Sequence, residues 1–269
     1  PSLGRSFGEQ DIASRATRRG QSREATTVAH FWDDETALFV LNLPWLAEEE
    51  GPRLCDRSLA NALLFDQCPG DQVDACLNVL ATRPPELGRC YPPNEVWPLL
   101  AQARHRQLSP VLEALRGRWA EMDSVAQNGT LQEFWQVRPD SPDEWSHCPM
   151  APLLSLFSGV IGLAPLSPGF KRLRLRPQFG DLPHLAVTAY TAKGPLHVQV
   201  EPSTGGHLVR LELPADCEAV LDLPADLAPL DLPIAASLSD APYPVRRYLL
   251  PQEFEYFQPA DLPQGGLHH

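Results

Sequence analysis

A carboxylate, Glu133, lies in the part of the sequence whose residue types are best suited to chemistry. It follows a glycine turn at Asn128-Gly129-Thr130 and precedes the aromatic pair Phe134-Trp135. After a short polar gap, the run Trp145-Ser146-His147-Cys148 opens a long apolar segment and brings in a histidine. Pockets that cleave sugars are often assembled in this way. Glycoside hydrolysis normally uses two carboxylates, one as acid and one as base or nucleophile, so this chemistry requires a second carboxylate.

Each candidate also has a purely structural interpretation. Glu133 by itself is by default a solvated loop carboxylate, and His147 at a helix start can simply cap the helix or bond to the backbone. Trp135 and Trp145 are more often core aromatics than platforms for a sugar ring. Asn128-Gly129-Thr130 has the form of a glycosylation sequon, although its central glycine favours a tight turn. The residue types alone leave these alternatives open.

The composition argues against several classes of partner. The chain has 269 residues with 43% hydrophobic content, enough for two cores of ordinary domain size in a soluble protein. Its 34 acidic and 22 basic residues give a net charge of -12, which argues against nucleic acid or an anionic membrane as partner. A neutral ligand such as a sugar is compatible with this charge. The uncharged run at 149–166 is interrupted by prolines and glycines, so it predicts a core helix rather than a membrane span, which needs roughly 20 apolar residues.

The six cysteines predict neither a metal site nor a disulfide framework. They are Cys55, Cys68, Cys76, Cys90, Cys148 and Cys217. The set contains no CxxC pair and no cluster with histidine, which a zinc site would require. A chain of this size does not need disulfides for stability, so buried free thiols are favoured over disulfides. We expect no metal and no cofactor.

Apolar residues at helical spacing fill the first part of the chain. Residues 1–24 carry no strong period and predict a poorly ordered segment or a truncated helix. Ser58 and Asp71 are expected to cap two helices joined by Cys68-Pro69-Gly70, and Ser109-Pro110 to begin a later one. The residues expected to face inward are Leu59, Leu63, Leu64, Val73, Cys76, Leu77, Leu80, Trp97, Leu100, Ala103, Val111, Leu115, Trp119, Met122, Leu153, Leu156, Phe157, Val160 and Ile161. Paired helices with short links predict a helical barrel or bundle.

After Pro165 the apolar period changes from 3.6 to 2, which predicts a domain boundary. Just before it, Gly162 is expected to end the last helix in a left-handed conformation. Alternating residues between Leu173 and Leu223 predict short strands of an antiparallel sandwich, with residues 248–250 as a candidate last strand. The expected domains are a poorly ordered or truncated segment at 1–24, helices at 25–163, a β-sandwich at 164–257 and a loose tail at 258–269.

Three motifs together carry a family resemblance. They are the turn Thr130-Leu131-Gln132-Glu133 followed by Trp135, the Ser146-His147-Cys148 entry into an apolar helix, and the junction from Gly162 to Lys171 followed by Arg176-Pro177-Gln178. With them, residues 29–202 resemble the C-terminal half of an α-L-rhamnosidase of the six-hairpin glycosidase type, glycoside hydrolase family 78. Residues 31–36 and 60–63 are similar to barrel segments of that family. The junction is the most specific part of the match, and it is structural.

The resemblance implies the later helices of an (α/α)6 barrel followed by a C-terminal antiparallel β-sandwich. It also implies an enzyme that cleaves terminal α-L-rhamnose with inversion of configuration. The water-activating carboxylate of the family corresponds to Glu133, the histidine that lines the sugar pocket to His147, and the aromatic residue beside the base to Trp135. The implied partners are a rhamnose-containing oligosaccharide or glycoside and further N-terminal barrel segments of the same polypeptide.

The sequence departs from the family at two positions and lacks one component. Gln132 stands where the family usually has tryptophan, and Pro149-Met150 replaces small or aromatic residues after the histidine. These changes imply altered pocket walls. The acid of the family comes from upstream barrel segments, and its nearest echo here, residues 66–71, is poor. We therefore expect this chain to hold the base without the acid.

Three hypotheses remain open at this point. The first is the base-bearing part of an inverting α-L-rhamnosidase, nearly inactive by itself. The second is a non-catalytic carbohydrate-binding or structural remnant of such an enzyme. The third is a helical-barrel glycosidase that acts on another sugar.

Overall fold

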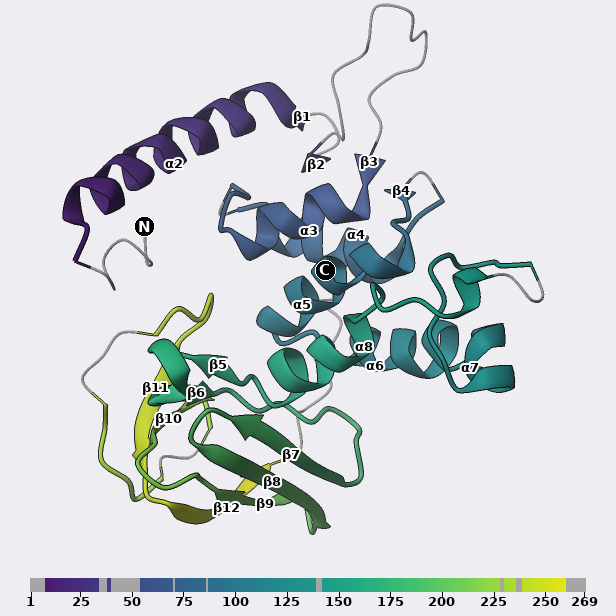
Figure 1. Cartoon of the computed structure of the whole chain (residues 1–269). Coiled ribbons are helices and arrows are strands. Elements are labelled where there is room, and N and C mark those ends of the chain that lie inside the picture. Colours follow the sequence, from purple (N-terminus) through teal and green to yellow (C-terminus); the bar gives the residue numbers. More distant parts are fainter. Residues whose placement is uncertain are drawn as a thin grey trace, which may run out of the picture. The chain divides into compact units, whose positions relative to one another are not determined.

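The computed structural model describes residues 8–33, 38–39, 54–69, 71–85, 87–138, 142–227, 230–235 and 239–259 of the chain. The chain divides into two compact units, Pro1–Ala101 and Gln102–His269. The first unit is built mainly from helices, and the second from helices followed by two sheets (Figure 1). Residues 34–36 of the family-like segment at 31–36 and the residues after Pro259 lie outside the described residues. The domain bounds expected from the sequence stay predictions.

The first unit opens on a long helix, α2, Gln10–Phe31. Most of the segment that was expected to be poorly ordered or truncated therefore lies in one continuous helix, which runs past the predicted bound at residue 24. The elements that follow are β1 Trp32–Asp33, β2 Leu38–Phe39, β3 Leu54–Cys55, α3 Asp56–Leu64, α4 Val73–Thr82, β4 Leu87–Gly88, a 3-10 turn at Pro92–Asn94 and α5 Val96–Arg104, whose last three residues belong to the second unit. The strand pair β1-β2 is antiparallel and the pair β3-β4 is parallel.

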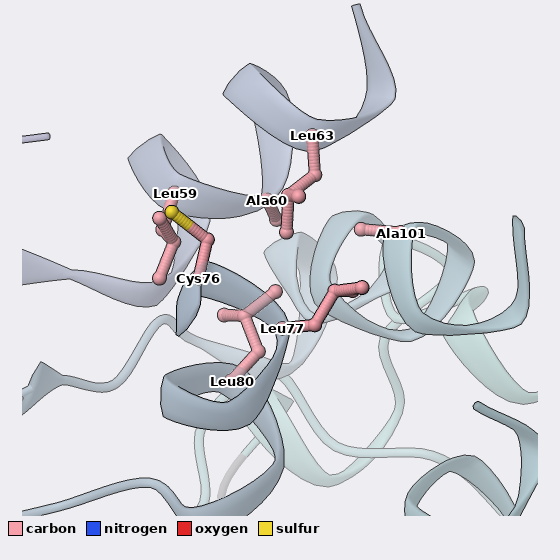
Figure 2. Packing of buried hydrophobic residues seen from close by; sticks show 7 residues of the cluster. All are labelled: Leu59, Ala60, Leu63, Cys76, Leu77, Leu80 and Ala101. Carbon is pink, nitrogen blue, oxygen red and sulfur yellow. The ribbon is translucent and has the colours of Figure 1, made fainter. Parts of the chain in front are cut away.

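Helices α3 and α4 pack through the apolar faces that their spacing predicted. Figure 2 shows the buried cluster, which consists of Leu59, Ala60, Leu63, Cys76, Leu77, Leu80 and Ala101. Burying one leucine contributes about 1.5–3 kcal/mol, so this cluster is a main source of stability in the unit. The predicted caps were wrong, because Ser58 lies inside α3 and the residue before α4 is Gln72 rather than Asp71. Neither helix has a side-chain cap, and α3 continues directly from strand β3.

The second unit begins with short helices, two of which widen into π-helical turns. They are α6 Leu108–Ala114 with a π turn at Leu115–Trp119, α7 Asp123–Asn128, a 3-10 turn at Pro142–Glu144, and α8 Ala151–Leu154 with a π turn at Ser155–Val160. The predicted inward stripe is largely confirmed, since Val111, Trp119 and Met122 are buried. The predicted start was wrong by two residues, because Ser109 lies inside α6 and Gln107 precedes it.

Two residues predicted to face inward are exposed instead. Trp97 of α5 is 37% exposed and Leu153 of α8 is 49% exposed. Helix α8 and its π turn bury residues that are mostly small, namely Ala151, Ser155, Gly159 and Val160. A side chain on Gly159 would place its Cβ 3.2 Å from the Cβ of Ala103. The backbones at Gly159 and Ala103 therefore approach each other closely on the buried face of this helix. Leu153 and Leu154 lie on its exposed face.

The rest of the second unit is two four-stranded sheets (Figure 1). The strand orders are β11-β10-β6-β5 and β12-β9-β8-β7. The strands are β5 Ala164–Pro165, β6 Arg172–Leu175, β7 Leu185–Thr191, β8 Gly194–Ser203, β9 Gly206–Glu212, β10 Glu218–Pro224, β11 Val245–Leu250 and β12 Glu253–Pro259. The predicted alternation is confirmed in β9, where Val209 and Leu211 are buried and Arg210 is exposed. The pairing is antiparallel except between β6 and β10, which run parallel.

The C-terminal strand β12 was missed. Residues 248–250 were expected to form the last strand, but they belong to β11, and β12 follows and pairs with β9 along its whole length. Gln258, which was placed in a loose tail, is 3% exposed and accepts a hydrogen bond of 3.0 Å from the Tyr256 hydroxyl. Glu253 and Glu255 alternate with the less exposed Phe254 and Tyr256, so the period-2 signal of a half-buried strand was present in the sequence and was overlooked.

The predicted helix end at Gly162 is confirmed. Gly162 has a φ of 66°, in the left-handed region that favours glycine. The last residues of this helix are hydrogen-bonded to the segment that follows strand β6. The Arg176 N–H donates to the Ile161 carbonyl at 3.1 Å, and the Gln178 N–H donates to the Val160 carbonyl at 2.9 Å. The family-like junction is thus a close backbone contact between a helix end and the segment after β6.

Gly162→Ala is expected to destabilise the second unit. A Cβ at this position would lie 2.3 Å from the Arg176 carbonyl oxygen, which is backbone and cannot rotate away. The left-handed conformation alone costs about 1–3 kcal/mol for a non-glycine residue, and the steric contact adds to it. Gly129→Ala is the matched control, because Gly129 has a φ of 65° but nothing within 4 Å of the added Cβ. Urea unfolding should show the larger loss for Gly162→Ala, and equal losses would contradict the steric argument.

None of the helices in the described part of the chain has the length and apolarity that a membrane span needs. The run at 149–166 instead ends its helix at Val160 and turns into β5. All six cysteines are free thiols, as the sequence favoured, and Cys76, Cys90 and Cys217 among them are buried.

Candidate functional site

The candidate site is built around the turn that ends helix α7. Gly129 takes the left-handed conformation after the helix, which confirms the predicted tight turn. The Asn128 side-chain amide donates to the Glu144 carboxylate at 3.3 Å, and the Thr130 hydroxyl donates to the Glu144 carbonyl at 2.7 Å. The turn is therefore held against the 3-10 turn at Pro142–Glu144, a segment more than ten residues further along the chain.

The buried side chain of Gln132 binds backbone groups of helix α7 and of the two residues after Glu133. Its side chain is 1% exposed, and its Oε1 accepts a hydrogen bond of 3.1 Å from the Ser124 N–H. Its Nε2 donates to the Phe134 carbonyl at 2.8 Å and to the Trp135 carbonyl at 3.2 Å. One buried amide thus connects the start of α7 to the two residues that follow Glu133. A tryptophan, which has no acceptor and only one donor, could not make these three contacts.

Two backbone hydrogen bonds bring the two motifs of the sequence together. The Glu133 N–H donates to the Asp143 carbonyl at 2.8 Å, and the Ser146 N–H donates to the Leu131 carbonyl at 2.9 Å. The segments at 131–133 and 143–146 therefore lie side by side. This contact places the start of the Ser146-His147-Cys148 motif next to the carboxylate.

Glu133 is half-buried and bound by a serine. The Ser146 hydroxyl donates a hydrogen bond to Oε2 of Glu133. The Cys148 N–H donates to the Ser146 oxygen at 3.2 Å. That oxygen accepts a hydrogen bond from the backbone, while its own proton is donated to the carboxylate.

The aromatic side chains of the turn fall into two groups. Trp135 packs edge to face on the buried Trp119, with ring centroids 5.4 Å apart, and the Arg118 guanidinium lies 4.8 Å from its ring centroid. Phe134 and Trp145 are 38% and 55% exposed. Trp135 therefore anchors the turn to the helices, whereas Phe134 and Trp145 present more of their surface to solvent.

His147 is exposed at the start of the second motif. Its Nε2 lies 3.8 Å from the Cys148 sulfur. The Glu133 carboxylate accepts a hydrogen bond from Ser146, the neighbour of His147. The structure thus brings Glu133 and the His147 segment together.

Sequence reasoning missed two residues of this site. Ser146 was part of a quoted motif and received no role, and Gln132 was noted only as a departure from the family. Their functions depend on backbone groups that spacing does not reveal. The described residues contain no group of three or more histidine, cysteine, aspartate or glutamate side chains that could hold a metal ion.

Comparisons with known proteins agree on one family. Residues 162–230 match the family model described as "Bacterial alpha-L-rhamnosidase C-terminal domain". No curated protein matches the chain. The solved GH78 family rhamnosidase of Bacillus sp. GL1 is similar with a TM-score of 0.70 and 22% identity, covering 83% of this chain and 24% of that one. The α-L-rhamnosidase of Aspergillus terreus is similar with a TM-score of 0.67 and 16% identity, covering 95% and 28%.

A third solved structure, the Streptomyces avermitilis α-L-rhamnosidase complexed with L-rhamnose, has a TM-score of 0.52 and 13% identity, covering 75% of this chain and 21% of that one. The predicted resemblance to the C-terminal part of α-L-rhamnosidases is confirmed by these matches. The chain spans about a quarter of the length of these solved structures. At such identities the likeness establishes the fold alone, and a complete (α/α)6 barrel is not evident among the described residues.

Proposed function

We propose that this chain is the base-bearing C-terminal part of a glycoside hydrolase that cleaves terminal α-L-rhamnose with inversion of configuration. The observation that carries the proposal is the hydrogen bond from Ser146 to Glu133. It fixes a half-buried carboxylate in a turn whose neighbouring aromatic side chains, Phe134 and Trp145, are exposed. The matching family model and the solved rhamnosidases support the same substrate class.

Glu133 is the proposed general base. In an inverting glycosidase the base removes a proton from water as the water attacks the anomeric carbon, and it stands about 6.5–9.5 Å from the acid. Ser146 donates to Oε2 of Glu133, so the proposed water is bound at Oε1. The backbone N–H of Cys148 keeps the serine in this orientation. Ser146 thus acts as a positioning residue that holds the carboxylate toward the water.

His147 and Trp135 are the proposed sugar-contacting residues, as the family resemblance implies. His147 is exposed and its imidazole can donate or accept a hydrogen bond with a sugar hydroxyl. Trp135 is held by Trp119 and Arg118, and we propose that the remaining part of its ring contacts the sugar. Rhamnose carries a methyl group in place of a hydroxymethyl group, and an aromatic wall suits such a group.

The helices before residue 164 are proposed to be the later helices of an (α/α)6 barrel at 25–163, followed by the β-sandwich at 164–257. Leu153 and Leu154 of α8 are 49% and 37% exposed, as expected where neighbouring barrel helices would cover them. Glu144 is an unsuitable acid, because it is 3% exposed and bonded to Asn128. We therefore place the acid on further barrel segments of the same polypeptide.

The full-length gene product is expected to hydrolyse an aryl α-L-rhamnoside in preference to other aryl glycosides. Proton NMR during the first turnovers should show β-L-rhamnose as the initial product, since inversion requires it. This chain by itself is expected to show little hydrolysis, because the proposal places the acid on other barrel segments. Binding of rhamnose without hydrolysis by the full-length product would favour the non-catalytic remnant, and hydrolysis of another glycoside would favour a different sugar specificity.

A further inference from the structure

Two nearly buried arginines at the end of strand β6 use few of their hydrogen-bond donors. Arg174 lies on β6 and Arg176 directly follows the strand, and their side chains are 12% and 9% exposed. Toward the described residues, each guanidinium donates through one nitrogen, and both of these nitrogens bind Oδ1 of Asp240. Within the same residues, the Nε–H groups of both arginines are buried without a partner. A buried donor without an acceptor is costly, so these donors are suited to an acceptor that the described part of the chain does not supply.

Asp240 satisfies the two arginines only in part. Its carboxylate is 69% exposed, and its Oδ1 is the atom that accepts from both guanidiniums. Arginine binds a carboxylate or phosphate most strongly through two parallel N–H donors, and one shared oxygen cannot provide this arrangement to either guanidinium. We propose that Arg174 and Arg176 form a binding site for an oxyanion, whose oxygens bind the donors that Asp240 leaves unused.

The charges around the two arginines leave an excess of positive charge. Asp222 of β10 accepts from Arg176 at 3.1 Å, but Arg247 of β11 binds both oxygens of the same carboxylate. The Asp240 carbonyl accepts from a further arginine, Arg104, at 3.4 Å. The side chains joined in this way are five arginines and three aspartates, namely Arg104, Arg106, Arg174, Arg176, Arg247, Asp222, Asp226 and Asp240. In a chain with a net charge of -12, this local excess of positive charge attracts an anion.

The ligand of this site is an oxyanion with at least two oxygen atoms. A neutral hydroxyl group would leave the excess charge unbalanced, whereas a carboxylate, sulfate or phosphate group offers both negative charge and several acceptor oxygens. Such a group is carried by a free inorganic ion or by an acidic sugar, and both share the chemistry that the two guanidiniums recognise. Asp240 competes with either ligand, because its carboxylate uses the same cations. The site does not depend on the proposed hydrolase activity.

The test is a titration of the full chain, prepared with isotope-labelled arginine, in which NMR follows the Nε–H resonances of Arg174 and Arg176. Sodium sulfate and sodium glucuronate are the probes, and sodium chloride at equal ionic strength is the control. We expect both resonances to shift to saturation with at least one of the two oxyanions and not with chloride. Tighter binding of sulfate would identify a free inorganic ion as the ligand type, and tighter binding of glucuronate an acidic sugar. Shifts that grow linearly and that chloride reproduces would overturn the proposal.

Three variants, followed through the Arg176 resonance, separate the site from general effects of charge. Arg174→Gln is expected to weaken oxyanion binding by about tenfold or more, because it removes a charge-assisted contact. Arg172→Gln is the matched control and should bind like wild type, since Arg172 lies on the same strand but is 44% exposed and pairs with the exposed Glu218 at 2.9 Å. Asp240→Asn should instead tighten binding, because it removes the competing charge.

Equal affinities of Arg172→Gln and Arg174→Gln, or weaker binding by Asp240→Asn, would contradict the proposal. The wild-type titration decides it even if Arg174→Gln fails to fold.

Discussion

Glu133→Gln in the full-length gene product is expected to lower kcat on an aryl α-L-rhamnoside by about 10²–10⁴-fold, the range that general base catalysis supplies. The amide has nearly the same shape as the carboxylate and can still accept the Ser146 hydrogen bond, so KM should change little. What the variant loses is the ability to remove a proton from water. Steady-state kinetics of wild type and variant, purified in parallel, measure both parameters.

Azide separates loss of the base from loss of the fold. This anion attacks a carbon centre without giving up a proton, so it should restore turnover in Glu133→Ala and yield a rhamnosyl azide of inverted configuration. Glu121→Gln is the control, because Glu121 is an exposed carboxylate outside the turn. Wild-type turnover by Glu133→Gln would falsify the assignment of the base. Loss of activity without azide rescue, together with altered unfolding, would instead assign Glu133 a structural role.

Asp222→Asn is expected to destabilise the second unit by about 3–5 kcal/mol, the cost of breaking a buried ion pair from one side. Asp222 is 0% exposed on β10 and accepts from Arg247 at 2.5 and 2.7 Å, from Ser239 at 2.7 Å and from Arg176 at 3.1 Å. Arg247 lies directly opposite on β11. Removal of the negative charge takes from Arg247 and Arg176 the buried carboxylate that they share, and Arg176 keeps its ion pair with the more exposed Asp240. Urea unfolding of the full chain gives the free-energy difference.

The Asp222 carboxylate should also make the unfolding free energy of the protein depend on pH in the acid range. Burial raises the pKa of Asp222, but hydrogen bonds from Arg247, Ser239 and Arg176 outweigh it, so the net pKa lies below the ordinary value. A depressed folded-state pKa adds stability above the unfolded value of about 3.9, and this stability is lost as the pH falls through that value toward the folded pKa. Between pH 7 and pH 3 the wild type should therefore lose more unfolding free energy than Asp222→Asn.

Asp226→Asn is the matched control for Asp222. Asp226 is 75% exposed and lies 3.7 Å from Arg106, an ion pair of the surface type that contributes about 0–1 kcal/mol. A small effect for Asp226→Asn beside a large one for Asp222→Asn would support burial as the cause. Similar small effects in both variants would contradict the argument from the buried network.

Apolar periodicity was reliable where one face of an element is buried. The spacing of Leu59 and Leu63 in α3 and of Cys76 and Leu80 in α4 identified the core of the first unit, because a helix must bury one stripe of side chains. Glycine at 162 predicted a helix end for an equally local reason, since a residue without Cβ takes the left-handed conformation at little steric cost. These features are set by a few neighbouring residues.

Predictions of helix starts and buried residues from local sequence were wrong where contacts with distant parts of the chain determine them. Ser58 was expected to cap α3, but the helix begins at Asp56, directly after β3 has paired with β4, and the Asp56 carboxylate is bound by the backbone of Cys90. Leu153 was expected inside, but it is 49% exposed, while Gly159 of the π turn after α8 lies against Ala103. Neither contact can be predicted from the residues near it in the sequence.

The candidate site divides in the same way. Glu133 was identified as the residue to examine from its glycine turn, its aromatic neighbours and a family resemblance, all of which the sequence contains. Its partner Ser146, thirteen residues away, and the buried amide of Gln132 were found only in the folded chain. The sequence determined which carboxylate is the candidate base, because residue types and spacing are local properties. Only the tertiary structure decided how that carboxylate is held, because its hydrogen bonds come from backbone groups brought together by the pairing of residues 131–133 with 143–146.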